Sequence, residues 1–255
     1  MWHLWIDATP RPGYANMSLD LALLDRTQQS AEQWLRLYRW QPFCLSFGRH
    51  EPAARRYDQR RIEQLGLDTV RRPTGGRAVW HATELTYAIT APVEAFGSSR
   101  SAYVEIHQLM LAALGGLGVQ GVLATVSRAS GVGAGPCFSR PAGGEVLVEG
   151  RKVVGSAQLC RGSGLLQHGS ILLEDAQHLV ESLRCGPLPS PAPSPSQRYP
   201  LGRSLDAGAL SDAVVQSAMT RWSGSWKRWN QPEQVLQAAD QYFPHFQSVE
   251  WTWTR

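Results

Sequence analysis

Residues 145–158 read EVLVEGRKVVGSAQ, a pattern typical of a β-hairpin. Apolar residues at 146–148 lead into Glu149-Gly150, a dipeptide suited to a tight turn, and a second strand is expected from Lys152 onward. The small residues Gly155-Ser156-Ala157 follow in that strand, where a ligand can lie directly against the backbone. The segment therefore predicts an antiparallel pair of strands beside a candidate binding surface.

Lys152 stands out because only two of the twenty-five basic residues are lysines. An ammonium is a compact charge with an adjustable pKa, whereas a guanidinium is planar and permanently charged. A lysine kept against this bias is a candidate for a role that arginine cannot fill. The alternative is a lysine beside a turn that has no function.

The four cysteines, Cys44, Cys137, Cys160 and Cys185, are widely spaced, without a CxxC pair or zinc-ligand spacing. Each is expected to be a small buried hydrophobic residue unless it is a reactive thiol. Cys137 precedes the hairpin that carries Lys152, and a nearby ammonium favours the nucleophilic thiolate. The sequence therefore predicts a Cys137–Lys152 pair, and no metal site.

RRPTGGRAVWH, residues 71–81, combines a proline-led turn, a glycine pair and a following strand. Gly75 and Gly76 allow backbone N–H groups to approach an anion, and the arginines at 71, 72 and 77 supply positive charge. These features suit a phosphate, an adenylate or a phosphopantetheine arm, although an ordinary turn before a strand has the same appearance. His81 alone is more typical of a structural histidine than of a catalyst.

LLQHGSILL, residues 165–173, is an apolar strand interrupted by His168-Gly169-Ser170. The polar step leaves backbone accessible, and the flanking leucines and isoleucine can line a slot for a hydrophobic chain. A core strand with a kink is the alternative interpretation.

The composition is that of a globular protein: 255 residues, 43% hydrophobic and 18% charged, enough for one large domain or two small ones. No apolar run approaches the roughly 20 residues that span a bilayer, and no secretory signal precedes the first helix, so a cytoplasmic protein is expected. The net charge of +4 is scattered. It favours acidic protein partners over nucleic acid or a membrane.

Periodicity and turn residues predict an α+β fold with strands in the middle of the chain and helices at both ends. Asn16 or Ser18 is expected to cap the first helix, and Leu85, Tyr87 and Ile89 to mark a half-buried strand. Helices are expected at 16–31, 57–65, 98–117, 211–222 and 231–242, and strands at 42–47, near 85–89, at 145–148, from 152 and at 169–173. The proline-rich segment 187–197 predicts an extended, exposed loop.

The three segments RRPTGGRAVWH, GRKVVGSAQ and LLQHGSILL, in this order, resemble the lipoate–protein ligase A / octanoyltransferase family. NMSLDLALL at 16–24 and RWQPFCLSFGRHEP at 39–52 also resemble that family. The resemblance covers roughly Trp5 to Leu183. It implies one catalytic domain over 1–255, with a core at 5–183, the loop at 187–197 and a C-terminal helical segment at 198–255. The implied α+β fold has a central mixed sheet flanked by helices, shared with the catalytic domain of biotin–protein ligases.

The resemblance is greatest to the ligase-like, cysteine-dependent octanoyltransferases, because Cys137-Phe138-Ser139-Arg140-Pro141 fits their CFxxP pattern. It implies transfer of an octanoyl group from acyl carrier protein to a lysine of a lipoyl domain, through a thioester on Cys137 assisted by Lys152, without a cofactor. The acceptor would be a glycine cleavage H protein or a 2-oxoacid dehydrogenase E2 subunit. The implied substrate-binding residues are Arg71, Arg72, Thr74, Gly75, Gly76, Arg77, Ala78, Val79, His81, Gly155, Ser156, Ala157, Gln158, His168, Gly169 and Ser170.

Two departures from the family pattern are PAGGEV before the hairpin and His81-Ala82-Thr83-Glu84, where a His-Asp pair is common. The nearest alternative is an ATP-dependent lipoate–protein ligase in which Cys137 has no role. A lipoyl amidotransferase and a non-catalytic lipoyl-domain binder are further alternatives. A biotin ligase is disfavoured because the GRGRxG-type loop is absent.

Overall fold

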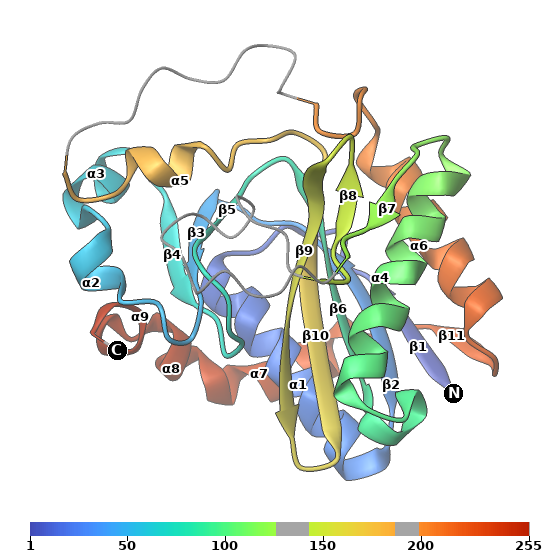
Figure 1. Cartoon of the computed structure of the whole chain (residues 1–255). Helices are drawn as coiled ribbons and strands as arrows, with labels where there is room; N and C mark the ends of the chain where they lie inside the picture. The colour runs from blue at the N-terminus through green and yellow to red at the C-terminus, as the bar shows by residue number, and fades with distance from the viewer. Residues whose placement is uncertain (126–142, 187–198, 255) are drawn as a thin grey trace.

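The computed structural model describes residues 1–125, 143–186 and 199–254, in which eight strands form one mixed sheet (Figure 1). Its strand order is β11-β1-β2-β6-β10-β9-β8-β7. β1 runs parallel to β2 and β11, and every other neighbouring pair is antiparallel. The bounds are β1 Trp2–Ile6, β2 Gln33–Tyr38, β6 Glu84–Pro92, β7 Val122–Leu123, β8 Val146–Val148, β9 Arg151–Arg161, β10 Gly164–Leu172 and β11 Trp226–Arg228. The expected α+β fold with a central mixed sheet is confirmed.

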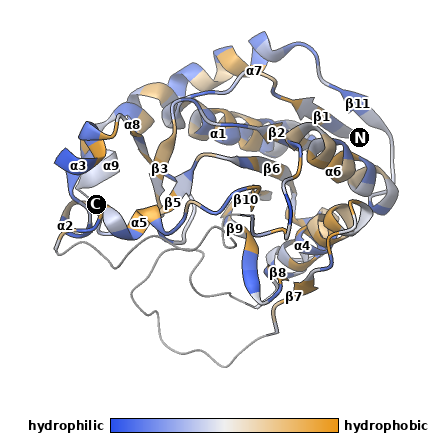
Figure 2. Ribbon diagram, turned by 90° about the horizontal axis from the view of Figure 1, so that it is seen from above, coloured by the Kyte–Doolittle hydropathy of each residue, from blue (hydrophilic) through white to orange (hydrophobic). Residues whose placement is uncertain are grey.

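Helices cover both faces of this sheet (Figure 2). Alternate residues of β6, Leu85, Tyr87 and Ile89, pack with α4 (Ser99–Gly116) and α6 (Ala207–Arg221). Ala88, between them, packs with α1 (Gly13–Ser30) on the opposite face, where α7 (Pro232–Ala239) also lies. The expected half-buried strand is therefore wrong: residues 84–91 are all buried, because this strand lies between two helical layers.

The first helix begins before the predicted residue and has no local cap. Asn16 and Ser18, the predicted caps, are buried inside α1. Asp68 instead accepts the N–H of Gly13 at 2.5 Å, from a strand that is remote in the sequence. Gly13 also allows close packing, since a Cβ there would lie 2.8 Å from the Cys44 sulfur. A cap that comes from tertiary structure cannot be recognised from the local sequence.

The other predicted helices are confirmed within a few residues. Ser98 caps α4 as expected for a helix starting near that position. Asp206 caps α6, which begins four residues before the predicted start, and Asp58 caps the short helix α3 (Gln59–Gln64). The segment predicted helical at 231–242 forms α7 followed by the 3₁₀ turn η3 (Asp240–Tyr242). A second 3₁₀ turn, η1 (Val93–Phe96), precedes α4.

The predicted hairpin is present, with Glu149 and Gly150 both at positive φ (50° and 75°), as a type I′ turn requires. β10 begins at Gly164 instead of the predicted 169, because it pairs with β6 from Gly164 to Leu172 and with β9 from Gly164 to Ile171. β1 and β2 were not predicted. The predicted C-terminal helical segment also contains a strand, β11, which extends the main sheet.

A second, three-stranded sheet has the order β4-β3-β5 and lies beside β9 and β10 in Figure 1. The strand predicted at 42–47 is β3, which starts at Cys44. The bounds in this part are β3 Cys44–Phe47, β4 Asp68–Arg71, β5 Val79–His81, α2 Ala53–Arg56, α3 Gln59–Gln64, α5 Leu179–Ser182, α8 Phe243–Gln247 and α9 Val249–Trp253. None of the helices in the described residues combines the length and apolarity required to cross a membrane.

Candidate active site

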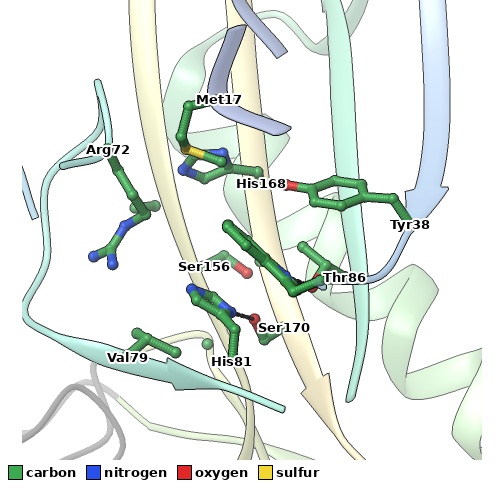
Figure 3. Close-up of a pocket in the computed structure, with 13 residues that line it drawn as sticks. Met17, Tyr38, Arg72, Val79, His81, Thr86, Ser156, His168 and Ser170 are labelled. Atoms are coloured by element: carbon green, nitrogen blue, oxygen red, sulfur yellow. Dashed lines mark hydrogen bonds between the residues drawn. The ribbon is translucent and has the colours of Figure 1, made fainter. Parts of the chain in front are cut away.

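A small cavity lies where β5 faces the main sheet, with a volume of about 30 Å³ (Figure 3). A water needs about 10–15 Å³ by this measure, so the closed part of the cavity has room for about two waters. The described residues that line it are Met17, Tyr38, Trp40, Arg72, Val79, His81, Thr86, Gly155, Ser156, Ala157, His168, Gly169 and Ser170.

Nine residues expected at a substrate site line this cavity: Arg72, Val79, His81, Gly155, Ser156, Ala157, His168, Gly169 and Ser170. They come from three segments of the chain that fold together. Sequence reasoning missed four others, Met17, Tyr38, Trp40 and Thr86, which α1, β2, the loop after β2 and β6 supply. Met17 and Trp40 fall inside the segments 16–24 and 39–52, which resemble the family. This resemblance was the only sequence feature that pointed to them as cavity residues.

Arg71 does not line the cavity in the described structure, and its expected contact with substrate stays a prediction. Its buried guanidinium donates to the carbonyl oxygens of Trp251, Gly48 and Glu51 at 2.8, 2.8 and 2.7 Å. It also donates to the carbonyl oxygen of Thr252 at 2.9 Å. Arg71 therefore ties β4 to the C-terminal helix α9 and to the loop after β3.

Arg72 turns toward the cavity and holds the glycine loop in place. It donates to the carbonyl oxygens of Gly75 and Arg77 at 3.2 and 2.7 Å. Gly76 has a φ of 91°, which favours glycine. The predicted site residues that do not line the cavity in the described structure are Arg71, Thr74, Gly75, Gly76, Arg77, Ala78, Gln158 and Lys152. Ala78 packs in the core of the small sheet instead.

Lys152 lies at the start of β9, next to the Glu149-Gly150 turn, and its side chain is buried. Its Nζ lies 2.7 Å from Oε1 of Glu145, which is also buried. The Tyr103 hydroxyl donates to the same carboxylate oxygen at 3.3 Å. The β8–β9 ladder shifts register next to Lys152, and such bulges re-aim side chains. Sequence reasoning missed Glu145 as a member of the site.

Cys137 and the rest of its CFxxP segment lie outside the described residues. Of the other cysteines, Cys44 is buried as expected, and burial raises its thiol pKa well above the usual value. The same expectation is wrong for Cys160 and Cys185, which are exposed. Cys160 lies near the end of β9, beyond the cavity-lining residues of that strand.

His168 is fixed between two elements that meet at the cavity. Its Nδ1 lies 2.8 Å from Oδ2 of Asp20, and its Nε2 lies 2.7 Å from the Thr74 hydroxyl. Asp20 also accepts from the Tyr38 hydroxyl at 3.0 Å, and Figure 3 shows that hydroxyl pointing toward His168. The guanidinium of Arg36 balances the charge of Asp20, with Nη1 3.0 Å from Oδ1. Thr74 therefore takes part indirectly, by connecting the glycine loop to His168.

His81 is held by contacts on three sides. It stacks on Trp40 with ring centroids 3.9 Å apart, its Nδ1 lies 2.6 Å from Glu84, and its Nε2 lies 2.6 Å from the Ser46 hydroxyl. Burial lowers the pKa of His81, although Glu84 acts in the opposite direction. A neutral ring donates from Nδ1 to the carboxylate, so Nε2 accepts from Ser46. His81 therefore lines the cavity with its ring held in one orientation.

Ser156 is held by two buried residues of the main sheet and α4. His107 Nε2 lies 3.0 Å from its Oγ, and the Tyr87 hydroxyl forms a short hydrogen bond with the same oxygen. Burial, reinforced by the charge of Lys152, lowers the pKa of His107 to about 4, despite a hydrogen bond to the Tyr103 carbonyl. The charge of Lys152 therefore acts on His107, the residue that hydrogen-bonds to Ser156.

The depressed pKa of His107 predicts a loss of stability in mild acid. Between about pH 6.5 and 4 the unfolded histidine binds a proton that the folded one excludes, so stability falls as the pH falls. By pH 5 we expect a loss of about 2 kcal/mol in the free energy of unfolding from this residue. Urea unfolding at pH 7.5 and pH 5.0 measures it, with His107→Gln as the control. An equal pH dependence in the variant would assign the effect to other groups.

Comparisons with known proteins place this arrangement in a family. Residues 12–194 match the model of the lipoyl protein ligase A/B catalytic domain. The octanoyltransferase LipM of Carboxydothermus hydrogenoformans is 40% identical over 185 residues, covering 71% of this chain and 68% of the relative. The octanoyltransferase LipM of Moorella thermoacetica is 33% identical over 245 residues, covering 86% and 85%.

The fold has a counterpart among solved structures. A T. acidophilum protein described as a lipoate protein ligase, solved with bound lipoic acid, superposes with a TM-score of 0.78 at 16% identity, covering 98% of both chains. This similarity concerns the fold alone. The family match over most of the chain and the identity to the two relatives lead to one conclusion: the chain belongs to the lipoyl protein ligase A/B catalytic domain family.

Proposed function

We propose that this protein is an octanoyltransferase that moves an octanoyl group from acyl carrier protein to a lysine of a lipoyl domain, through a thioester on Cys137. The observation that carries the proposal is Lys152, a buried ammonium paired with Glu145 and three residues along β9 from the cavity-lining Gly155. The relatives named octanoyltransferase, at 33–40% identity, support the choice of acyl group and reaction.

In the first half-reaction the Cys137 thiolate attacks the carbonyl carbon of the carrier thioester. The new C–S bond forms, the bond to the pantetheine sulfur breaks, and Lys152 gives that sulfur its proton. Lys152 is then neutral. Exchange of one thioester for another is nearly balanced in energy, so the enzyme has to present the nucleophile and stabilise the oxyanion. Lys152 and the backbone near Gly155 and Gly169 are the candidates for that stabilisation.

In the second half-reaction the lysine amine of the acceptor attacks the octanoyl carbonyl on Cys137. The C–N bond forms, the C–S bond breaks, and the electron pair returns to sulfur as the thiolate. The amine proton passes to neutral Lys152, which restores the starting charge state. The net charge of +4 suits acidic protein substrates, a carrier protein and a lipoyl domain.

The test is an intact mass after incubation with octanoyl-acyl carrier protein, without ATP or acceptor. We expect a gain of one octanoyl group, absent in Cys137→Ser. Cys160→Ser is the matched control, because Cys160 is exposed and lies away from the cavity. It should still form the adduct. If no adduct forms and an acyl-adenylate appears with ATP and free acid, the protein is a ligase and Cys137 has no catalytic role.

A further inference from the structure

The segment 49–61, RHEPAARRYDQRR, holds most of the net charge of the chain. Its five arginines and two acidic residues give a net charge of +3, which leaves +1 of the total of +4 for all other residues. The segment forms α2, the first half of α3 and the turns before them. The positive charge is therefore concentrated on one part of the fold.

The two short helices of this segment turn their apolar residues inward and their arginines outward. Ala53, Tyr57 and Ile62 are buried in the same hydrophobic cluster as residues of the small sheet. Arg55 and Arg60 are exposed. Figure 1 shows α2 and α3 on the side of the small sheet that lies away from β9 and β10. The helices therefore present positive charge to the solvent.

The two acidic residues of the segment are used within its own fold. Glu51 is buried and accepts from Arg56 at 2.9 Å and from the Tyr57 hydroxyl at 3.1 Å. Asp58 is the cap of α3, where it accepts the main-chain N–H of Arg61. It also forms a longer ion pair with the Arg61 guanidinium, at 3.8 Å. These two carboxylates thus compensate two of the five arginines.

Arg49, Arg55 and Arg60 are the three arginines that remain uncompensated. Within the part of the chain that the structure describes, none of their side chains has an ion-pair or hydrogen-bond partner. Arg55 and Arg60 are exposed, and Arg49 is half-buried. The three residues, which we call the basic surface, lie within twelve positions of one another. Together they produce a positive potential that attracts an acidic partner.

The basic surface begins next to the cavity of the candidate active site. The N–H of Arg49 donates to the carbonyl oxygen of Thr74 at 2.8 Å, and the Thr74 hydroxyl lies 2.7 Å from Nε2 of the cavity-lining His168. The preceding Gly48 packs so closely that a Cβ there would overlap the carbonyl oxygen of Gly76. The basic surface therefore leads from the cavity wall outward over α2 and α3.

The two protein substrates of the proposed reaction differ in how far their reacting groups reach. The octanoyl group of the carrier is at the end of a long, flexible phosphopantetheine arm, so the carrier can dock at a distance from the cavity. The acceptor lysine reacts at the end of a four-carbon side chain, so a lipoyl domain has to dock at the cavity itself. A surface that leads away from the cavity fits the substrate with the longer arm.

We propose that the basic surface is the docking site of acyl carrier protein, whose acidic side chains pair with Arg55 and Arg60. The inference rests on the proposed octanoyl transfer and concerns the encounter that precedes its first half-reaction. Exposed charges attract one another over roughly a Debye length, about 8 Å at physiological ionic strength. The basic surface therefore raises the rate at which the carrier associates, and it leaves the chemistry in the cavity unchanged.

The double variant Arg55→Glu/Arg60→Glu tests the basic surface with two octanoyl donors. One donor is octanoyl-acyl carrier protein below saturation, and the other is octanoyl-pantetheine, which has the arm without the protein. Intact mass in single turnover measures loading from each. We expect loading from the carrier to slow by about tenfold to hundredfold, and loading from octanoyl-pantetheine to change less than about twofold. About 0.5 M NaCl should narrow the difference between wild type and variant, because it screens exposed charges.

Two further variants and a second step serve as controls. Arg100→Glu/Arg228→Glu changes the net charge equally, but these exposed arginines lie on α4 and β11, at the opposite end of the molecule from α2 and α3 in Figures 1 and 2. It should load within about threefold of wild type. Arg55→Lys/Arg60→Lys keeps the charge and should do the same. Discharge of the isolated acyl-enzyme to a lipoyl-domain protein should be unchanged in all three variants.

The remaining results would overturn the docking site while octanoyl transfer itself stands. Equal slowing with both donors would mean that the substitutions disturb the cavity, and normal loading from both would mean that the carrier docks elsewhere. Slower discharge with normal loading would assign the basic surface to the lipoyl domain. Equal slowing in Arg100→Glu/Arg228→Glu would make net charge alone responsible. A wild-type protein that loads from neither donor would instead refute octanoyl transfer, and the docking site with it.

Discussion

Lys152→Met is expected to slow octanoyl transfer by about 10²–10⁴-fold, because the variant lacks the group that donates and accepts the proton in both half-reactions. It is also expected to lower the free energy of unfolding by about 3–5 kcal/mol. The substitution leaves the buried Glu145 carboxylate without the ammonium that lies 2.7 Å away. Single-turnover rates and urea unfolding at pH 7.5 measure the two effects separately.

The double variant Lys152→Met/Glu145→Gln distinguishes a catalytic lysine from a structural one. The glutamine that replaces Glu145 is neutral and can still accept the Tyr103 hydroxyl, so most of the lost stability should return. The transfer rate should not return, because neither of the two new side chains can exchange a proton. If the double variant regains both stability and activity, Lys152 serves the fold alone and the proposed mechanism is wrong.

The parts of the fold that were predicted correctly depend on local chemistry. The hairpin at 145–158 follows from a turn whose two residues both adopt positive φ, and α4 follows from a serine cap and a regular apolar face. β2 was not predicted, since Arg36 interrupts an otherwise apolar strand. Its charge is acceptable only because Asp7 and Asp20 lie 2.8 and 3.0 Å away. Such a partnership is tertiary information.

In the candidate site, too, residues with a local sequence signal were predicted and residues that depend on tertiary packing were missed. The small residues of β9 and β10 were found because they are unusual in an apolar strand. Met17 and Trp40 were missed because an apolar residue that lines a cavity looks the same in sequence as one that fills a core. Glu145 was missed because its importance comes from burial beside Lys152, which a hairpin pattern does not reveal.

Arg71 and Arg72 show the limit of interpreting a motif by charge alone. Arg71 is the last residue of β4 and Arg72 follows it in extended chain, so the two side chains point to opposite sides and only one faces the cavity. Arg72 does, whereas Arg71 donates to main-chain oxygens of two segments, the loop after β3 and the helix α9. Both arginines suit an anion site in the sequence. The strand geometry assigns one to the cavity and the other to the fold.

Arg71→Met is therefore expected to destabilise the protein strongly without slowing its chemistry. The substitution removes the donor for carbonyl oxygens of Gly48, Glu51, Trp251 and Thr252. Buried carbonyl groups that lose a charged donor are costly, and we expect the free energy of unfolding to fall by about 3–5 kcal/mol. Urea unfolding at pH 7.5 measures the loss, and hydrogen exchange should show earlier opening of α9.

Arg71→Lys is the matched control, because an ammonium keeps the charge but lacks the planar fan of donors that reaches several carbonyl groups at once. Its loss of stability should lie between those of wild type and Arg71→Met. At 15 °C, where both variants remain folded, loading and discharge should stay within about threefold of wild type. A variant that is stable but slow in transfer would return Arg71 to the substrate site and contradict the assignment. A loss below about 1 kcal/mol would show that water replaces the guanidinium at these carbonyl groups.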